Sequence, residues 1–396
     1  MKNLVDRSVE LLVVGAGPVG LTAGLCAARR GLRVELIEQN FRGWGRGFAA
    51  LLHPSSIRIF KELGVAERLW ESGHAIHGVV VHADRAPSIR VQLAEPALSV
   101  AQARIEEALL SKLRAEGVDL RAPFEAGTLQ QEPAKVRVRA VRRELIELGS
   151  PADFSSWRPL ESSLIEADFV IGADGYESKI RSALGIEALN VDTTEAFAMF
   201  EVELNGDFGD DIHIGFSDGL GSMLLPLAGS RVRLGFQLES ELAEEPGIER
   251  LKSLVRERFP WFQHELRALD WSTVMHFERR LARRFGAGRV WLAGDAAHVT
   301  SPFGAQSMNS GLTEVRDLVD HVARCLAGES TPDSLERYGH TRAREWQKLL
   351  GFHVKYELLP NAPDWTATYA RRLIPALPVS GVDMPETLRA FGLAVV

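Results

Sequence analysis

A glycine-rich turn between two apolar runs is the feature that most constrains how this chain folds. Residues 10–14, with the apolar run 11–14, read as a buried strand, residues 15–20 read Gly-Ala-Gly-Pro-Val-Gly, and a helix-forming segment and a second apolar run follow. Gly15 permits a tight turn, Gly17 lets a pyrophosphate approach the backbone, and Gly20 lets the helix pack closely on the strand. The pattern predicts a strand–helix–strand unit of an α/β fold that binds a nucleotide at the turn.

Glu38, the last residue of this unit, restricts which nucleotide the unit can bind. Glu38 ends the second apolar run, where a carboxylate accepts hydrogen bonds from the ribose of an adenosine. A carboxylate at this position also repels a 2′-phosphate. The unit is therefore expected to bind FAD or NAD rather than NADP.

A second segment, residues 289–311, again combines an apolar run, a polar tip and a helix start. Asp295 follows the apolar run 290–293, and the turn at 301–304 has helix-start chemistry. The residues after the turn recur at helical spacing: Leu312, Val315, Leu318, Val319, Val322, Ala323 and Leu326. The carboxylate suits a polyol hydroxyl and the helix N-terminus suits an anion, although this stretch alone also fits an ordinary strand–turn–helix.

A third segment, residues 168–181, ends an apolar strand in Asp174 and then opens a helix with Ser178 and Arg181. Asp174 is interpreted either as a nucleotide contact or as a helix cap. The Gly- and Arg-rich residues 41–48 include Arg46, which either reaches back over a phosphate or ribityl chain or belongs to a solvated loop.

The remaining pattern changes from helical periods to period two. Residues 51–63 are expected to form a helix with His53 at its start, residues 76–93 a β-hairpin, and the polar residues 149–160 a loop. From 195 to 238 the alternation predicts an antiparallel sheet that is separate from the nucleotide-binding part.

Composition excludes several other classes of protein. The chain of 396 residues has 46 basic and 53 acidic residues, a net charge of −7, which argues against a nucleic-acid partner. Cys26 and Cys325, the only cysteines, fit core thiols in a reducing compartment, and no metal-ligand spacing occurs. No signal peptide or membrane span is read, so a cytoplasmic protein is expected.

Taken together, the three segments resemble those of the group A flavoprotein monooxygenases, the family of p-hydroxybenzoate hydroxylase. The resemblance covers nearly the whole chain, and it implies FAD as cofactor and FAD contacts at these positions: Gly15, Gly17, Pro18, Val19, Gly20, Glu38, Gln39, Arg46, Gln102, Asp174, Gly294, Asp295, Gly304, Ala305, Gln306, Met308 and Asn309. The sequence departs from the family at Ser307, where glycine is usual, and at Glu314 and Asp317, where Asp and Asn are usual.

The resemblance also implies the architecture: an α/β fold with a Rossmann-like FAD-binding domain, an antiparallel-sheet substrate domain and C-terminal helices. The expected FAD-binding domain comprises residues 1–74, 99–182 and 276–350. Residues 75–98 and 183–275 form the expected substrate domain, and residues 351–396 a helical tail. A monomer or a homodimer is expected.

The activity that the resemblance implies is hydroxylation of an aromatic molecule with NADH or NADPH and O2, through a flavin C4a-hydroperoxide. The helix after Pro302 is expected to stabilise the anionic reduced flavin at its N1–C2=O edge. Three alternatives share the fold: a flavin-dependent halogenase, whose Trp-x-Trp-x-Ile-Pro motif is not found; a reductase of isoprenoid double bonds; and a flavin- or ligand-binding protein without turnover.

The strands at 212–227 and 232–236 are expected to form the ceiling of the substrate pocket, and Pro302 to Gly304 its floor beside the flavin. Arg231 and Arg233 alternate with apolar residues, so both are predicted to face solvent and to leave an uncharged pocket. A largely apolar aromatic, including a polycyclic one, is therefore expected. His213 is a candidate base or polar contact, with a surface role as the alternative.

Overall fold

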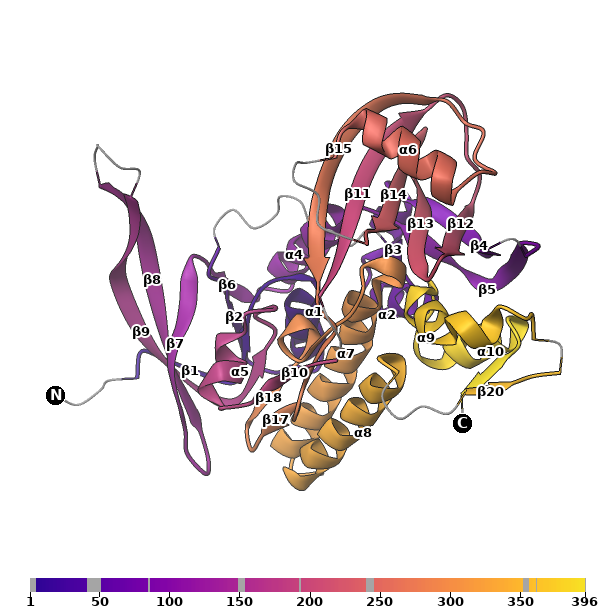
Figure 1. The fold of residues 1–396 in the computed structure, drawn as a ribbon. Helices are drawn as coiled ribbons and strands as arrows, with labels where there is room; N and C mark the ends of the chain where they lie inside the picture. Colours follow the sequence, from indigo (N-terminus) through magenta and orange to yellow (C-terminus); the bar gives the residue numbers. More distant parts are fainter. Residues whose placement is uncertain are drawn as a thin grey trace.

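The computed structural model describes residues 5–40, 51–84, 86–148, 154–191, 194–239, 246–351, 356–360 and 362–395. Two eight-stranded sheets dominate this part of the chain. Figure 1 shows the helices α1 and α7 beside the first sheet, and the second sheet rising above them beneath helix α6. The site therefore has to be sought where the two sheets approach the same helices.

The first sheet confirms the predicted strand–helix–strand unit. Strand β1 (Arg7–Val14) pairs in parallel with β2 (Val34–Ile37), and helix α1 (Pro18–Arg29) connects them. On its other side β1 pairs in parallel with β9 (Phe154–Gly172), which pairs with β18 (Val290–Leu292). Because these parallel strands end level with one another, the turns that follow them meet at one edge of the sheet.

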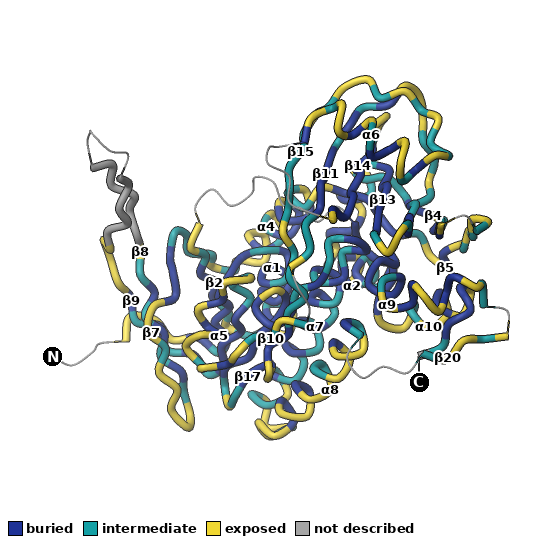
Figure 2. Tube along the Cα trace, viewed as in Figure 1, coloured by how far each residue is buried: buried dark blue, intermediate teal, exposed yellow. Residues whose placement is uncertain are grey.

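The other strands of this sheet are β6 (Asp119–Arg121), β7 (Phe124–Gln131), β8 (Val136–Leu148) and β17 (Gly286–Ala287), in the order β17-β18-β9-β1-β2-β6 with β7 and β8 branching from β9. Helices α4 (Gln102–Ala115), α7 (Gln306–Leu326) and α8 (Asp333–Leu349) lie with α1 beside it. The apolar positions predicted for the helix after Pro302 are buried at Leu312, Val315, Leu318, Val319 and Val322. Figure 2 shows this core as the dark-blue centre of the molecule.

The loop predicted for residues 149–160 is wrong from residue 154 onward. There β9 pairs with β8 in antiparallel register from Leu148↔Phe154 to Arg143↔Pro159. The register shifts at Arg142 and Arg143, next to the proline that has no N–H to offer the ladder. Backbone pairing to β8 therefore prevails over a composition that favours a loop.

The second sheet contains the predicted hairpin of β4 (His74–Ala83) and β5 (Ile89–Ser99). Its order is β15-β11-β14-β13-β12-β4-β5-β3, and all neighbours are antiparallel except the parallel pair β4–β12. The remaining strands are β3 (Leu51–Leu52), β11 (Glu195–Leu204), β12 (Asp211–Ser217), β13 (Leu220–Leu227), β14 (Arg231–Gln237) and β15 (Leu266–Phe277).

Alternation along these strands gives the second sheet two different faces. Leu224, Leu234 and Phe200 face helix α6 (Ile248–Arg258) and form one core. Met199 and Met223, on the opposite face, belong to another core, which includes Phe303 and helix α9 (Thr366–Ala376). This second face is directed at the loop that follows β18.

Smaller elements complete the described chain. They are α2 (Pro54–Glu62), α3 (Ala66–Trp70), α5 (Lys179–Ala183), α10 (Met384–Ala390), β10 (Ala188–Asn190), β16 (Arg280–Ala282), β19 (His298–Val299), β20 (Tyr356–Leu358), β21 (Leu393–Val395) and the 3-10 turns η1 (Gly294–Ala296), η2 (Phe303–Ala305) and η3 (Gly381–Asp383). The helix expected over 51–63 starts only at Pro54, because residues 51 and 52 join the second sheet as β3. The C-terminal segment contains helices, as expected, and in addition the β20–β21 pair.

Candidate functional site

The first of three cavities, the Gly15 cavity, lies at the edge of the first sheet where β1 and β9 end. It has a volume of ≈ 300 Å³, and its lining includes Gly15, Gly17, Glu38, Gln39 and Asp174. Gly15 has φ +100°, and a Cβ there would lie 2.2 Å from the oxygen of Ala173. Glycine is therefore required at this turn both by the backbone conformation and by the close approach of the neighbouring strand.

Gly17 occupies the junction between this cavity and the next. It lines both cavities, and a Cβ built on it meets no atom within 4 Å, so a side chain would project into open space. Gly17 is also the N-cap residue of α1, whose first turn has no side-chain cap and no acidic residue. The junction thus offers free N–H groups and a partial positive charge to an anion such as a pyrophosphate.

Glu38 is held in place by two backbone N–H groups. Ala16 N donates to Glu38 Oε2 and Asn40 N donates to Oε1, both at 2.8 Å. The carboxylate is therefore fixed at the wall of the Gly15 cavity. Gly20 packs against the same turn, where a Cβ would collide with the oxygen of Gly15 at 2.0 Å.

The side chain of Asp174 caps helix α5. Its Oδ1 accepts from Ser178 Oγ at 2.6 Å, and Oδ2 accepts from the backbone N–H groups of Lys179 and Ile180. Arg181 is buried, and its guanidinium donates to the backbone oxygens of Ala296 and Tyr176. Of the two roles considered for Asp174, its hydrogen bonds are those of the cap, while the residue also lines the Gly15 cavity.

The second, or Asp295, cavity continues from Gly17 along the start of α7 and has a volume of ≈ 360 Å³. Its lining includes the predicted site residues Gly17, Pro18, Val19, Gln102, Asp295, Pro302, Ala305 and Met308. Asp295 is open to the cavity but deep within the protein, and this desolvation raises the pKa of its carboxyl. No described residue hydrogen-bonds that carboxylate, which leaves it available to hydroxyl donors.

Two predicted site residues, Gln306 and Asn309, bind backbone oxygens instead of lining a cavity, and a third, Gly294, packs against a side chain. Gln306 Nε2 donates to the backbone oxygens of Leu377 and Val379, both at 2.8 Å. Asn309 Nδ2 donates to the oxygens of Leu51 and Ala305. Gly294, with φ +61°, packs against Val19. These contacts fix the loop around Gly304, whose φ of +73° and packing against Pro375 leave no room for a Cβ.

Sequence reasoning missed the part played by His53 and Glu106. His53 is fully buried, its backbone N–H donates to Asn309 Oδ1, and its Nε2 lies 2.5 Å from the oxygen of Gly304. Burial lowers the pKa of His53 to about 3. Glu106 accepts from Gln102 Nε2 at 2.8 Å, and burial raises its pKa to about 6. Neither the helix-start position of His53 nor the position of Glu106 within helix α4 signalled these contacts.

A buried hydrogen-bonded network joins the residues after Asp295 to helices α7 and α8. His298 Nε2 lies 2.6 Å from Glu314 Oε2, and neither side chain is more than 2% exposed. Trp346 stacks on the imidazole with ring centroids 3.7 Å apart and donates its indole N–H to Glu314. Burial opposes ionisation of Glu314, but His298 and the two hydrogen bonds lower the pKa of its carboxyl.

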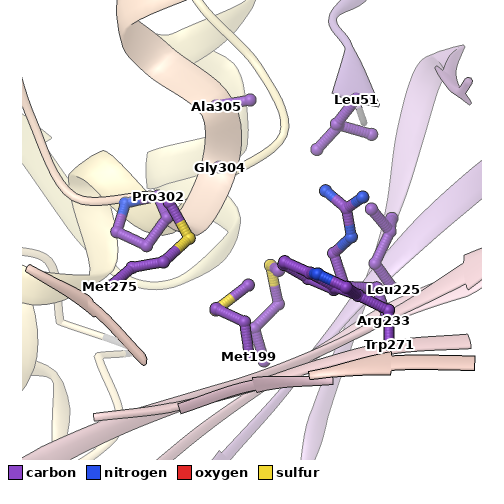
Figure 3. A pocket seen from close by; sticks show the side chains of 10 residues that line it. Leu51, Met199, Leu225, Arg233, Trp271, Met275, Pro302, Gly304 and Ala305 are labelled. Atoms are coloured by element: carbon purple, nitrogen blue, oxygen red, sulfur yellow. The ribbon is translucent and has the colours of Figure 1, made fainter. Parts of the chain in front are cut away.

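The third, or Arg233, cavity lies between the second sheet and the loop at Pro302. Its volume is ≈ 20 Å³, and it is lined by Leu51, Met199, Met223, Leu225, Arg233, Trp271, Met275, Pro302, Gly304 and Ala305. Pro302 and Ala305 line both this cavity and the Asp295 cavity. In Figure 3 the sheet supplies Met199, Trp271 and Leu225 from one side, and the loop supplies Pro302 and Gly304 from the other.

The prediction that Arg233 faces solvent is wrong. Arg233 is 8% exposed, and Figure 3 shows its guanidinium rising from the sheet into the cavity. Its Nε donates to Glu201 Oε1 at 2.9 Å from the neighbouring strand β11. Arg231 is on the same strand face and is exposed, as predicted, because it lies at the strand's far end, outside the cavity.

The placement of His213 corrects the expectation of a base near the substrate. His213 is paired with Leu224 in the β12–β13 ladder, so its side chain shares the face turned toward α6, away from the Arg233 cavity. Its Nδ1 lies 2.9 Å from His82 Nε2, and Trp261 stacks on both imidazoles. Burial lowers the pKa of His213 to about 4.

Three points from the sequence remain: Arg46, a metal site and a membrane span. Arg46 falls among residues 41–50, outside the described part of the chain. Among the described residues, no group of three or more His, Cys, Asp or Glu side chains is placed to hold a metal ion. No described helix is both long and apolar enough to cross a membrane.

Comparison with known proteins identifies the family to which the chain belongs. Residues 8–353 match the family described as the FAD binding domain. The chain belongs to this family. It is thereby placed among the FAD-dependent aromatic monooxygenases of the p-hydroxybenzoate hydroxylase type, and FAD is its cofactor.

Relatives of this flavoprotein include aromatic monooxygenases of bacteria. It is 28% identical to pentachlorophenol 4-monooxygenase of Sphingobium chlorophenolicum over 92% of its own length and 70% of the relative. It is 26% identical to 6-methylpretetramide 4-monooxygenase of Streptomyces rimosus over 86% of its own length, but spans only 60% of that relative.

A solved structure confirms the fold of the flavoprotein along nearly its whole length. The p-nitrophenol 4-monooxygenase PnpA from Pseudomonas putida DLL-E4 superposes with a TM-score of 0.71, at 16% identity, covering 97% of both chains. The flavin-dependent monooxygenase PieE, solved with FAD and substrate, superposes with a TM-score of 0.69 at 20% identity, covering 98% of this chain and 71% of PieE.

Proposed function

We propose that this flavoprotein hydroxylates a phenolic aromatic compound with NADH or NADPH and O2, and that the substrate binds in the Arg233 cavity. The observation that carries the proposal is that Pro302 and Ala305 line both the Arg233 cavity and the Asp295 cavity. Transfer of an oxygen atom from one bound group to another requires the two groups to be adjacent. A shared wall between the cofactor cavity and a mainly apolar pocket supplies that adjacency.

The proposed placement of FAD follows the two larger cavities. The adenosine ribose binds at Glu38, the pyrophosphate at Gly17 and the start of α1, and the ribityl chain at Asp295 and Gln102. The residues fit this group, because Gly17 leaves open the space a Cβ would fill and Asp295 has an unpaired carboxylate among the described residues. Bound FAD carries electrons from the nicotinamide donor and activates O2.

The same proposal assigns a role to each domain. The segments 1–74, 99–182 and 276–350 bind FAD, while 75–98 and 183–275 cover the flavin with the substrate sheet. Within the segment 351–396, Leu377 and Val379 support the loop at Gly304, since Gln306 donates hydrogen bonds to their backbone oxygens. Mutual contacts of this kind keep the loop at Gly304 in one conformation.

The side chains around the Arg233 cavity exclude water and adapt to a substrate. A volume of ≈ 20 Å³ is about the room that one water molecule needs, so an aromatic ring enters only if side chains move. Met199, Met223 and Met275 line the cavity, and methionine changes rotamer more readily than branched or aromatic residues. In the proposed complex these three residues open the space and Trp271 packs against the ring.

Arg233 selects the polar group of the substrate. Its charge is balanced by Glu201, so a second carboxylate in the cavity would have no unbalanced cation to bind. A phenol oxygen, by contrast, accepts a hydrogen bond from the guanidinium without adding a full charge. The hydroxyl group of a phenol donates electron density to the ring, which favours attack by an electrophilic oxygen. The proposed substrate is therefore a phenol that Arg233 orients, whereas the sequence predicted a largely apolar aromatic in a pocket without a charge.

Turnover with a panel of aromatics tests this function. Phenols, benzoates and neutral polycyclic aromatics are each incubated with holoenzyme, NADH or NADPH and ¹⁸O2, and the products are analysed by mass spectrometry. A phenol is expected to stimulate donor oxidation and to gain one labelled oxygen atom. Donor oxidation that yields only hydrogen peroxide with every compound would contradict hydroxylation and favour a ligand-binding role without turnover.

A matched pair of arginine variants tests the binding site. Arg233→Met is expected to raise KM for the phenol roughly ten- to hundredfold, because a hydrogen bond to a charged group contributes about 1.5–3 kcal/mol. Arg231→Met, on the same face of the same strand but exposed, is expected to leave KM unchanged. Equal effects of the two substitutions would place the substrate elsewhere.

A further inference from the structure

The start of helix α7 carries two hydroxyl groups that the proposed oxygen chemistry does not use. Thr300 and Ser307 both line the Asp295 cavity. Thr300 precedes the turn Phe303–Ala305, and Ser307 follows it. Thr300 N donates to Ser307 Oγ at 3.0 Å, so the two residues are joined across the loop. Glycine is usual at the position of Ser307 in the family that this chain resembles, so the hydroxyl at 307 is a departure of this chain.

Thr300 Oγ1 is an orphaned polar atom. The residue is 3% exposed, and no described residue hydrogen-bonds its hydroxyl. A buried hydroxyl without a partner costs free energy, roughly 1–3 kcal/mol, unless a ligand supplies the missing bond. Because Thr300 lines the cavity, the missing partner is expected inside it.

Ser307 has its acceptor role filled but not its donor role. Its Oγ accepts from Thr300 N, whereas no described carbonyl or carboxylate accepts the Ser307 proton. Other hydroxyls in helices of this chain donate to the backbone oxygen four residues earlier, as Thr313 donates to Asn309 and Ser182 to Ser178. The Ser307 proton is therefore available to a group in the cavity.

We propose that Thr300 and Ser307 donate hydrogen bonds to the acceptor edge of the flavin ring and thereby favour the reduced, anionic form of FAD. The inference rests on the proposed placement of FAD in the Asp295 cavity, and it is independent of the substrate. Both hydroxyls lie beside the N-terminus of α7, whose N-cap residue Ala305 provides no side-chain cap. Helix dipole and hydroxyl donors thus act on the same side of the ring.

The direction of the effect follows from differential binding. A donor that bonds the ring equally in both redox states strengthens FAD binding without changing its potential. Reduction places negative charge on the N1–C2=O edge, and a hydrogen bond to a charged acceptor is about twice as strong as one to a neutral acceptor. Removing either hydroxyl is therefore expected to make the bound FAD harder to reduce.

The midpoint potential of FAD in the purified holoenzyme, without substrate or nicotinamide, tests the proposal. At a fixed solution potential, Ser307→Ala and Thr300→Val are each expected to lower the ratio of reduced to oxidised FAD about tenfold. For a two-electron couple this equals a shift of about 30 mV toward negative potential. Ser307→Gly, a substitution by the residue usual in the family, is expected to give the same shift, and Ser307→Thr, which keeps the hydroxyl, to restore the parent potential.

Two further measurements separate the alternatives. Ser310→Ala, on the same helix but outside the cavity lining, is expected to leave the potential unchanged. Weaker FAD binding in Ser307→Ala and Thr300→Val at an unchanged potential would overturn the proposal and leave the two hydroxyls a structural role. Full FAD content in Asp295→Ala would instead contradict the proposed placement of FAD. That outcome is distinguishable from a failure of the two hydroxyl groups to affect the potential.

Discussion

The buried pair of His298 and Glu314 allows a strict test of how the loop behind the flavin is stabilised. Glu314→Leu removes the carboxylate that binds the imidazole of His298 and the indole of Trp346, both of which are buried. Removing the charged partner of a buried pair costs about 3–5 kcal/mol, because the remaining groups are left without a partner. The free energy of unfolding is expected to fall by about that amount.

A double-mutant cycle separates this coupling from loss of packing. His298→Phe keeps a ring against Trp346, where the imidazole now stacks at 3.7 Å between centroids. In the combined His298→Phe, Glu314→Leu variant only the Trp346 N–H remains unpaired, at a cost of about 1–3 kcal/mol. The combined loss is therefore expected to be smaller than the sum of the two single losses by about 2 kcal/mol or more.

Urea titration followed by far-UV circular dichroism measures these values, with flavin fluorescence reporting release of FAD. Glu345→Gln serves as the control, because Glu345 pairs with Arg342 at the surface and exposed pairs contribute less than about 1 kcal/mol. Additive losses in the cycle, or a Glu314→Leu variant as stable as the parent, would refute the coupling.

Two more predictions concern the cofactor and the pH dependence of stability. Asp295→Ala is expected to lower FAD occupancy severely and Glu38→Ala to weaken FAD binding by about 1–3 kcal/mol, measured as flavin absorbance per chain; full occupancy of Asp295→Ala would exclude its role at the ribityl chain. Burial lowers the pKa of His53 from 6.5 to about 3, so its stabilising contribution is complete above pH 6.5 and is lost as the pH falls toward 3. At pH 5 the loss is about 2 kcal/mol, and the stability difference between the parent and His53→Gln should shrink by that amount between pH 7.5 and 5.

Much of the FAD-binding part is predictable because its signals are local. Gly15, Gly17 and Gly20 serve a single turn and its helix, and the strand, helix and strand around them follow each other directly in sequence. The apolar spacing after Pro302 likewise identifies helix α7 without knowledge of any other element. Local signals failed at residues 154–160 and at residues 51 and 52, where pairing with another strand prevailed.

The chemistry of the substrate pocket depends on contacts between residues that are distant in sequence, which the sequence pattern does not reveal. Alternation places Arg231 and Arg233 on one face of β14, yet only Arg233 becomes buried, because β11 brings Glu201 beside it and the loop at Pro302 covers it. His213 is on the opposite strand face, which register with β13 decides.

The sequence by itself determined the family, the cofactor and the main elements, since these depend on residues close together in the chain. Tertiary structure alone decided which polar groups became buried and which partners they found. His53 meets Gly304 and His298 meets Glu314 only after the strands and helices have packed, and both imidazoles then lie at most 1% exposed. Burial strengthens each such contact and raises the cost of losing it, so the energetic character of the site arises from packing that sequence periodicity does not encode.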